Sequence, residues 1–322
     1  MKIAVDLEGG DKAPKAVLDA VSLVIRKRLL DPGELVAIGL GETVRHLHHR
    51  LRIRKIETVE CQQTVGMKDN LKQALYKKDS SIAKGMMGVK DGKFDAFISA
   101  GNTVAMVGSG VYHLGRLKKN VKPALAVPIP NRIGPCLILD VGAINHCEVN
   151  DYLHLAQMGN IYAKHVWGIA NPKIGLLNIG SESTKGDKTL QTTHHELSRL
   201  SLGLNFIGNV EADDILNTDL NVVVCQGSVG NPLLKFGEGV VELVSYKLGL
   251  IWKAMMFFDR FTRGADYKQI GGAPLLGIEG NVIIAHGKST AVVLANAIKL
   301  AAVAVRHDIN KVIAQEINDK TP

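Results

Sequence analysis

The stretch FDAFISAGNT, residues 94–103, decides the fold that we expect for this chain. It begins with a mainly apolar run from Phe94 to Ile98 and continues into the small polar sequence SAGNT. A near-continuous apolar run, as opposed to an alternating one, is typical of a β-strand that is covered on both faces. Glycine lets the loop that follows turn tightly. The stretch therefore predicts a buried strand that leads into a glycine-containing polar loop.

The same arrangement recurs along the whole chain. The further examples are KIAVDLEGGD (2–11), LILDVGAIN (137–145), KIGLLNIGSESTKG (173–186), NVVVCQGSVGN (221–231) and VIIAHGKST (282–290). Helical patterns lie between these strands: one opens at Pro14 and runs towards Arg28, one opens at Asp151, and an Ala/Val/Leu-rich one covers 289–305. Alternating buried strands and helices predict a three-layer α/β/α sandwich with a mainly parallel sheet.

We expect a single domain over residues 1–322. If it has two lobes, the proline-rich residues 120–135 are the best candidate for the crossover between them. No stretch approaches the roughly 18 uncharged apolar residues that a spanning helix needs, because Lys253 interrupts the longest candidate at 248–258. The chain also starts without a signal-peptide pattern, so we expect a soluble protein of the cytosol.

The charge of the chain indicates an anionic partner. Its 39 Lys and Arg outnumber 31 Asp and Glu, giving a formal net charge of +8. The basic residues are dispersed and not interleaved with aromatic ones, which argues against nucleic acid. The densest basic run, residues 45–55, is either a solvated helix face that runs into a strand or a patch that docks an acidic protein or a membrane surface. Neither its histidines nor the four scattered cysteines have the spacing of a metal site, so we expect no metal.

The polar loops after the strands predict where the chemistry takes place. In open α/β sheets ligands bind beyond the carboxyl ends of the strands, and glycine-rich loops leading into helices favour anions such as phosphate. The chain has no G-x-x-x-x-G-K-[ST] loop, no complete dinucleotide fingerprint and no G-x-S-x-G elbow. The residues alone thus indicate an α/β protein that binds an anion, and they name no reaction.

Taken together and in order, these loops resemble the bacterial phosphate acyltransferase family of phospholipid synthesis. The stretches that carry the resemblance span nearly the whole chain: VD (5–6), GGD (9–11), SAGNT (99–103), PALA (123–126), LDVGA (139–143), GLLNIG (175–180), NFIGNVEA (205–212), GGAPLLG (271–277) and AHG (285–287). There are departures. The main one is Gln226, which stands where the family usually has an aspartate.

The resemblance implies a fold like that of phosphotransacetylases and of the isocitrate and isopropylmalate dehydrogenases. It implies transfer of a fatty acyl group from acyl carrier protein to inorganic phosphate, without metal or organic cofactor. It further implies a homodimer, attached peripherally to the membrane, whose acyl phosphate product feeds a membrane glycerol-3-phosphate acyltransferase.

For this reaction we predict one site built from several loops. Lys185, together with Ser99, Asn102 and Thr103, is expected to position phosphate, as are Gly227 and Asn231. Asn178, Asn231 or His286 is expected to donate a hydrogen bond to the oxyanion or to the departing sulfur. The plainer alternatives are that Asn102 and Asn178 cap helices and that Lys185 is a solvated loop lysine. Cys225 is either an acyl-accepting nucleophile or, as we favour, a buried thiol.

Three other interpretations stay open at this point. One is a phosphate acetyl- or butyryltransferase that uses coenzyme A, and another is a dehydrogenase of the same fold. The third is a catalytically weakened scaffold, which the amide of Gln226 motivates. Finally, residues 240–261 place Val244, Leu248 and Ile251 on one helical stripe beside lysines. This pattern predicts either a dimer contact or an interfacial helix on anionic lipid.

Overall fold

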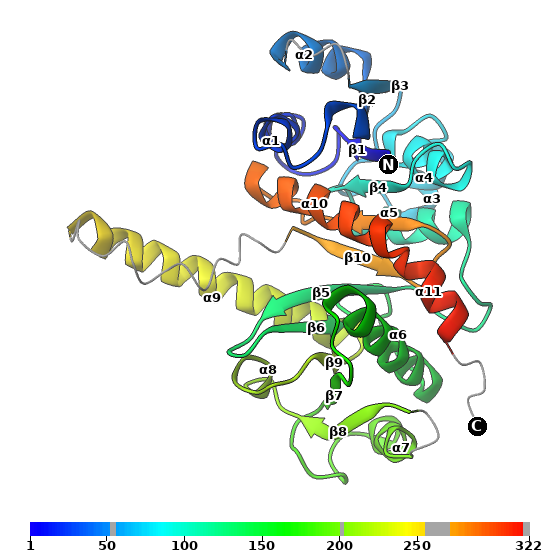
Figure 1. Cartoon of the computed structure of the whole chain (residues 1–322), viewed down its shortest axis with the longest axis vertical. Helices are drawn as coiled ribbons and strands as arrows, with labels where there is room; N and C mark the ends of the chain where they lie inside the picture. The colour runs from blue at the N-terminus through cyan, green and yellow to red at the C-terminus, as the bar shows by residue number, and fades with distance from the viewer. Residues whose placement is uncertain (52–55, 200–202, 255–270, 318–322) are drawn as a thin grey trace.

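The structure of the chain is a computed structural model, which describes residues 1–51, 56–199, 203–254 and 271–317 (Figure 1). The described strands form one 11-stranded sheet in the order β3-β2-β1-β4-β11-β10-β5-β6-β9-β7-β8. The strands are β1 (Ile3–Asp6), β2 (Leu35–Leu40), β3 (Glu57–Cys61), β4 (Ala96–Ser99), β5 (Ala124–Pro130), β6 (Pro135–Leu139), β7 (Lys173–Leu177), β8 (Asn205–Val210), β9 (Val222–Val224), β10 (Ala273–Leu276) and β11 (Asn281–Ile284). The α-helices of the described residues are α1 (Lys15–Arg26), α2 (Gly41–Leu51), α3 (Leu71–Tyr76), α4 (Ser81–Lys90), α5 (Thr103–Ser109), α6 (Val149–Trp167), α7 (Lys188–Leu197), α8 (Asp214–Asn217), α9 (Gly227–Ala254), α10 (Ala291–His307) and α11 (Ile309–Glu316).

The sheet consists of two groups of parallel strands. The first strand group is β3, β2, β1, β4 and β11, and the second is β6, β9, β7 and β8. Three successive antiparallel pairings, β11 with β10, β10 with β5, and β5 with β6, join them. Because three reversals separate the groups, their strands run in opposite directions. The carboxyl ends of the two groups therefore leave the sheet at opposite ends of the strands.

Helices cover both faces of the sheet, as the sequence predicts. On one face α1, α2, α6, α10 and α11 pack on side chains such as Ile3 and Val5. On the other face α3, α4, α5 and α8 pack on Ala4 and its neighbours. Successive residues of β1 thus point into different cores, and both cores consist mainly of apolar side chains. This two-sided burial explains why the strands read as continuous apolar runs.

The expected three-layer fold is confirmed, and each of the six predicted strands is present within a few residues. The six do not include β2, β3, β5, β8 or β10. Residues 120–135, expected as a candidate crossover, form β5 and the start of β6 in the middle of the sheet. Within the described residues, no helix combines the length and the apolar character needed to cross a membrane.

Helix α9 projects away from the body of the molecule (Figure 1). Several large apolar side chains of its outer part are exposed, among them Phe236, Leu243 and Tyr246. The predicted stripe continues beyond this helix, but residues 255–261 lie outside the described part of the chain.

Candidate functional site

A first loop cluster lies where β1, β4 and β11 end, and a buried carboxyl group is at its base. The Ser99 hydroxyl donates a hydrogen bond of 2.6 Å to Asp6 Oδ2, and the backbone N–H of Gly101 donates to Ser99 Oγ at 2.9 Å. The backbone N–H of Glu8 donates to Asp6 Oδ1 at 2.9 Å. Asp6 and Ser99 are only 2% and 1% exposed. Together they tie the loop after β1 to the loop after β4.

Gly9 lies directly on this pair because it has no side chain. A Cβ atom at residue 9 would lie 2.5 Å from Ser99 Oγ, 2.7 Å from Asp6 Oδ2 and 2.7 Å from the backbone nitrogen of Gly101. No real Cβ makes contacts this short. Glycine is therefore required here for close approach of two backbones.

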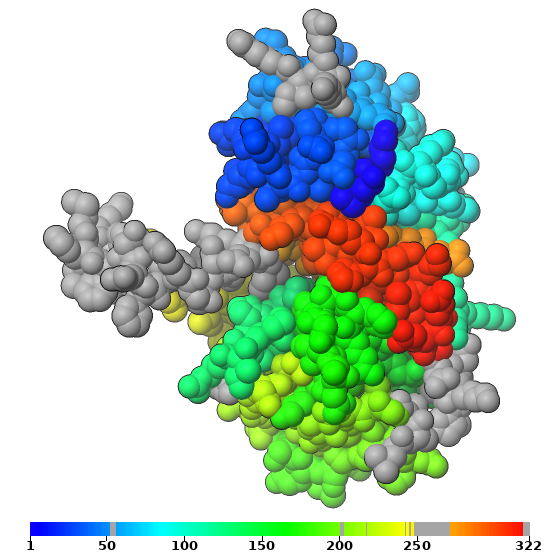
Figure 2. Space-filling model, in the orientation of Figure 1, coloured from blue at the N-terminus to red at the C-terminus, as the bar shows by residue number. Residues whose placement is uncertain are grey.

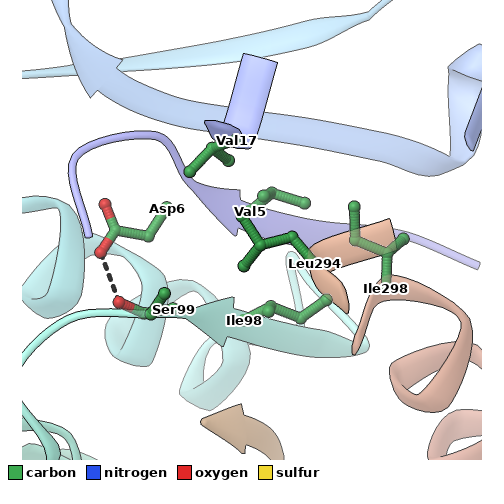
Figure 3. Close-up of a pocket in the computed structure, with 8 residues that line it drawn as sticks. Val5, Asp6, Val17, Ile98, Ser99, Leu294 and Ile298 are labelled. Atoms are coloured by element: carbon green, nitrogen blue, oxygen red, sulfur yellow. Dashed lines mark hydrogen bonds between the residues drawn. The ribbon is translucent and has the colours of Figure 1, made fainter. Parts of the chain in front are cut away.

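Behind the pair is a cavity of about 10 Å³, lined by Val5, Asp6, Val17, Ile98, Ser99, Ala100, Leu294 and Ile298 (Figure 3). This volume is near the lower limit for one water molecule, so no substrate fits inside it. Burial raises the pKa of the Asp6 carboxyl group above its ordinary value, although the hydrogen bonds from Ser99 and Glu8 act in the opposite direction. The pair is thus a buried support, and a substrate would bind on the loops above it.

Asn102 joins this cluster to a neighbouring loop. Its Oδ1 accepts the backbone N–H of Ala105 at 3.1 Å and so caps α5. This is the helix-capping role that the sequence analysis gives as the alternative to phosphate binding. Its Nδ2 donates to the carbonyl oxygens of Asp69 at 2.8 Å and Met67 at 3.1 Å. Both ends of the amide are therefore occupied by the protein itself. Thr103, the first residue of α5, is exposed beside it.

The loop after β11 completes the first cluster, where a lysine of this loop, Lys288, and a lysine of the loop after β1, Lys12, supply cations that are not among the predicted site residues. The backbone N–H of Asp11 donates to the carbonyl of Gly287 at 2.8 Å, and Lys12 Nζ donates to the carbonyl of Lys288 at 2.9 Å. His286 is exposed, and its Nδ1 accepts the backbone N–H of Lys288 at 3.3 Å. Both lysines directly follow glycine-containing motifs quoted above, and that position was the signal available in the sequence.

A second loop cluster lies where β6 and β9 end. Asp140 is fully buried and accepts the backbone N–H groups of Leu125 at 2.7 Å, Ala143 at 2.8 Å and Ile144 at 2.7 Å. Burial raises the pKa of its carboxyl group. A Cβ at Gly227 would lie 2.5 Å from Asp140 Oδ2, so this glycine also permits a close approach.

The neighbours of Gly227 belong to the same cluster. Asn231, one turn into α9, is partly buried, and a Cβ at Gly142 would lie 3.8 Å from its side chain. The side-chain carbonyl of Gln226 accepts the backbone N–H of Cys147 at 3.4 Å. An amide is thus accommodated at position 226 as a hydrogen-bond acceptor.

The predicted pair Asn178 and Lys185 follows β7, next to this second cluster. Asn178 Nδ2 donates to the backbone carbonyl of Lys185 at 3.1 Å, so the asparagine closes the loop between them and caps no helix. Lys185 Nζ lies 3.9 Å from Glu182 Oε2, and 44% of the lysine side chain is exposed. The lysine is accessible to an anionic ligand from solvent.

The predicted residues follow strands of both strand groups. Ser99, Asn102, Thr103 and His286 lie at the ends of first-group strands. Asn178, Lys185, Gly227 and Asn231 follow second-group strands, which point the other way.

The cysteines are all buried and free. Burial raises the pKa of the Cys225 thiol, which disfavours the nucleophilic thiolate. Its Sγ lies 3.4 Å from the backbone oxygen of Asp140. Among the described residues, no group of three or more His, Cys, Asp or Glu side chains is arranged to hold a metal ion.

Comparison with known proteins assigns the chain to a family. The family described as "Fatty acid synthesis protein" matches residues 1–312. The chain belongs to this family. Curated members similar to it include the phosphate acyltransferase of Halothermothrix orenii, 38% identical over 99% of both chains, and that of Dictyoglomus turgidum, 37% identical over 100% of this chain and 99% of the relative. These full-length matches make the chain a member of an acyltransferase family.

Solved structures agree with this assignment at the level of the fold. A phosphotransacetylase from Streptococcus pyogenes superposes with a TM-score of 0.62 at 15% identity, covering 96% of this chain and 94% of the other. A branched-chain phosphotransacylase from Enterococcus faecalis gives a TM-score of 0.59 at 12% identity, covering 95% and 100%. The expected likeness to the phosphotransacetylase fold is confirmed.

Proposed function

We propose that this protein transfers a fatty acyl group from acyl carrier protein to inorganic phosphate and releases acyl phosphate for phospholipid synthesis. The observation that carries the proposal is the 35–38% identity, over nearly the whole length, to proteins named phosphate acyltransferase. The loops at the ends of β1, β4 and β11 support it, since they combine close backbone approach at Gly9 with the cations of Lys12 and Lys288, which suit an anion.

The reaction needs no nucleophile from the protein. A phosphate oxygen attacks the thioester carbonyl carbon, a C–O bond forms, and the tetrahedral intermediate carries the negative charge on the former carbonyl oxygen. The C–S bond then breaks, and the thiolate takes up a proton. The protein has to hold phosphate against the carbonyl and to stabilise the oxyanion.

We assign these tasks to the first loop cluster. Lys12 and Lys288 supply positive charge beside the loops after β1 and β11, and the Thr103 hydroxyl lies at the start of α5. Because Nδ1 of His286 accepts a backbone N–H, the neutral ring carries its hydrogen on Nε2. That N–H is available to the oxyanion or to the departing sulfur.

The other predicted residues take different roles in this proposal. Ser99 and Asn102 hold the loops in place, because their polar atoms already bond to the protein. The roles predicted for four other residues in phosphate binding or catalysis stay predictions: those of Lys185, Asn178, Gly227 and Asn231. These residues follow strands of the second group, so substitutions there test a different set of loops.

We further propose that the enzyme works in the cytoplasm as a homodimer attached to the anionic membrane surface, where it passes its product to a membrane glycerol-3-phosphate acyltransferase. The exposed apolar side chains of α9, including Leu243 and Val244, support a contact with a second copy or with lipid. A soluble acyl carrier protein as donor and an apolar acyl phosphate as product both suit an enzyme at the boundary between cytoplasm and membrane.

The test is a donor comparison. Purified protein is incubated with phosphate and either a long-chain acyl carrier protein or a short acyl coenzyme A, and acyl phosphate is trapped as its hydroxamate. We expect efficient product formation from the carrier thioester. Product from the short coenzyme A thioester alone would assign the activity to a phosphate acetyl- or butyryltransferase instead.

A further inference from the structure

An exposed apolar strip runs from the first loop cluster along α3 and α5. Met67 and Val104 are 45% and 60% exposed, and Leu71 and Tyr112 are exposed as well. We call these four side chains the acyl platform. Helices α3 and α5 pack against each other, as Figure 1 shows for their ribbons, and α5 continues into the π-helical turn η2 (Gly110–Leu114), which contains Tyr112.

The platform is continuous with the site. Met67 Cε lies 2.9 Å from the position of a Cβ at Gly287, so this methionine covers the loop after β11. The amide of Asn102 holds the backbone of residues 66–69 against the start of α5. An acyl group whose carbonyl lies in the first loop cluster therefore meets Met67 first.

Gly108 lets the platform extend along α5. A Cβ at this residue would lie 2.1 Å from Leu71 Cδ1, so the leucine lies flat against the helix. Val104, Gly108 and Tyr112 are spaced by four residues, which places them on one side of the helical segment. At a rise of about 1.5 Å per residue the strip is about 12 Å long, a length that suits an extended hydrocarbon chain better than a short acyl group.

The border of the platform is basic. Residues 62–78 contain four lysines, at positions 68, 72, 77 and 78, and one aspartate, Asp69. Lys77 pairs with Asp69 at 2.6 Å, whereas Lys68, Lys72 and Lys78 form no ion pair with any described residue. Lys72 Nζ instead lies 6.0 Å from the Tyr76 ring centre. Positive charge around an apolar strip suits an acidic partner that carries an apolar group.

From this arrangement we infer, on the basis of the proposed function, that the acyl platform receives the acyl donor. The fatty acyl chain lies along the four side chains of the platform, and the acidic carrier protein docks on Lys68 and Lys72. The platform then selects long acyl chains by apolar contact, and the lysines select the carrier by charge.

The test measures the Kd of long-chain and short-chain acyl carrier protein for two variants. Val104→Asp places a charge on the strip and is expected to weaken long-chain binding about tenfold while leaving short-chain binding within about twofold. Lys68→Glu with Lys72→Glu is expected to weaken both donors about tenfold at low salt, and less as salt screens the charges.

Matched controls are Ile133→Asp, an exposed apolar residue in the turn between β5 and β6, and Lys27→Glu, an exposed lysine at the far end of α1. Both should bind donors as the parent does. Unchanged Kd values in the platform variants, or a Val104→Asp variant that changes oligomeric state, would overturn the inference. If the parent makes acyl phosphate while the platform variants bind normally, only the platform fails; if the parent makes none, the proposed function fails with it.

Discussion

Replacing Gly9 by alanine probes the base of the first loop cluster. The new Cβ would lie 2.5 Å from Ser99 Oγ and 2.7 Å from Asp6 Oδ2, and both groups are fixed by buried hydrogen bonds. The loops after β1 and β4 therefore have to separate. Overpacking of this kind costs about 1–3 kcal/mol, and a weakened hydrogen bond to a buried carboxyl adds about 1 kcal/mol. We expect the free energy of unfolding to fall by about 2–4 kcal/mol.

The effect on turnover should exceed the effect on folding. A displacement of about 1 Å in positioning groups commonly reduces rate by about 10²-fold, so we expect such a loss of kcat in Gly9→Ala at a temperature where the variant is folded. Denaturant unfolding and acyl phosphate formation are measured side by side. The control is Gly33→Ala, because nothing lies within 4 Å of a Cβ at residue 33. A Gly9→Ala variant with the stability and kcat of the parent would refute the assignment of this cluster as the site.

Three further substitutions test residues of the second cluster. Lys185→Ala should leave the fold intact and reduce kcat by at least about 10²-fold if its charge stabilises the reacting phosphate, with Lys188→Ala as the matched exposed lysine; equal rates in both variants would remove Lys185 from the reaction. Cys225→Ser should retain most activity, because the buried thiol is not needed for direct attack by phosphate; an acyl group found on Cys225 by mass spectrometry would contradict this. Gln226→Asp supplies the carboxylate usual in the family, and it should raise kcat because a carboxylate accepts protons where an amide does not. An unchanged or lower kcat would show that the loop is adapted to the amide, whose oxygen accepts the backbone N–H of Cys147.

The strands that the sequence predicts are those with uninterrupted apolar runs, such as β4 and β7. The strand β3 (ETVEC) lacks this pattern because most of its residues are partly or fully exposed at the edge of the sheet. The prolines Pro128 and Pro130 make the sequence of β5 unlike that of a strand. Both follow Ala124 and Leu125, the two residues through which β5 pairs with β10. A proline is tolerated there because no second neighbouring strand needs its N–H.

The candidate site could be predicted only in part, because the sequence does not show the direction of each strand in the sheet. The pattern of a buried strand is the same for either direction of the chain, so the sequence does not show that the second strand group is reversed. The prediction that Lys185 and Ser99 act in one site therefore rests on loops that follow strands of different groups. Ser99 and Asn102 were found as loop residues, but their bonds to Asp6 and to residues 66–69 come from tertiary packing and leave no local signal. The basic run at 45–55 proves to be largely helix α2, in which Arg50 pairs with Asp19, and residues 52–55 lie outside the described part of the chain.

The central claim, acyl transfer to phosphate, is tested most directly by following radiolabelled phosphate and free thiol in the same reaction. With a long-chain acyl carrier protein as donor, we expect one labelled phosphate to enter an organic-soluble, hydroxylamine-sensitive product for each thiol released, and no thiol release when phosphate is omitted. Thiol release without incorporation of label would show that water is the acceptor and would contradict the account.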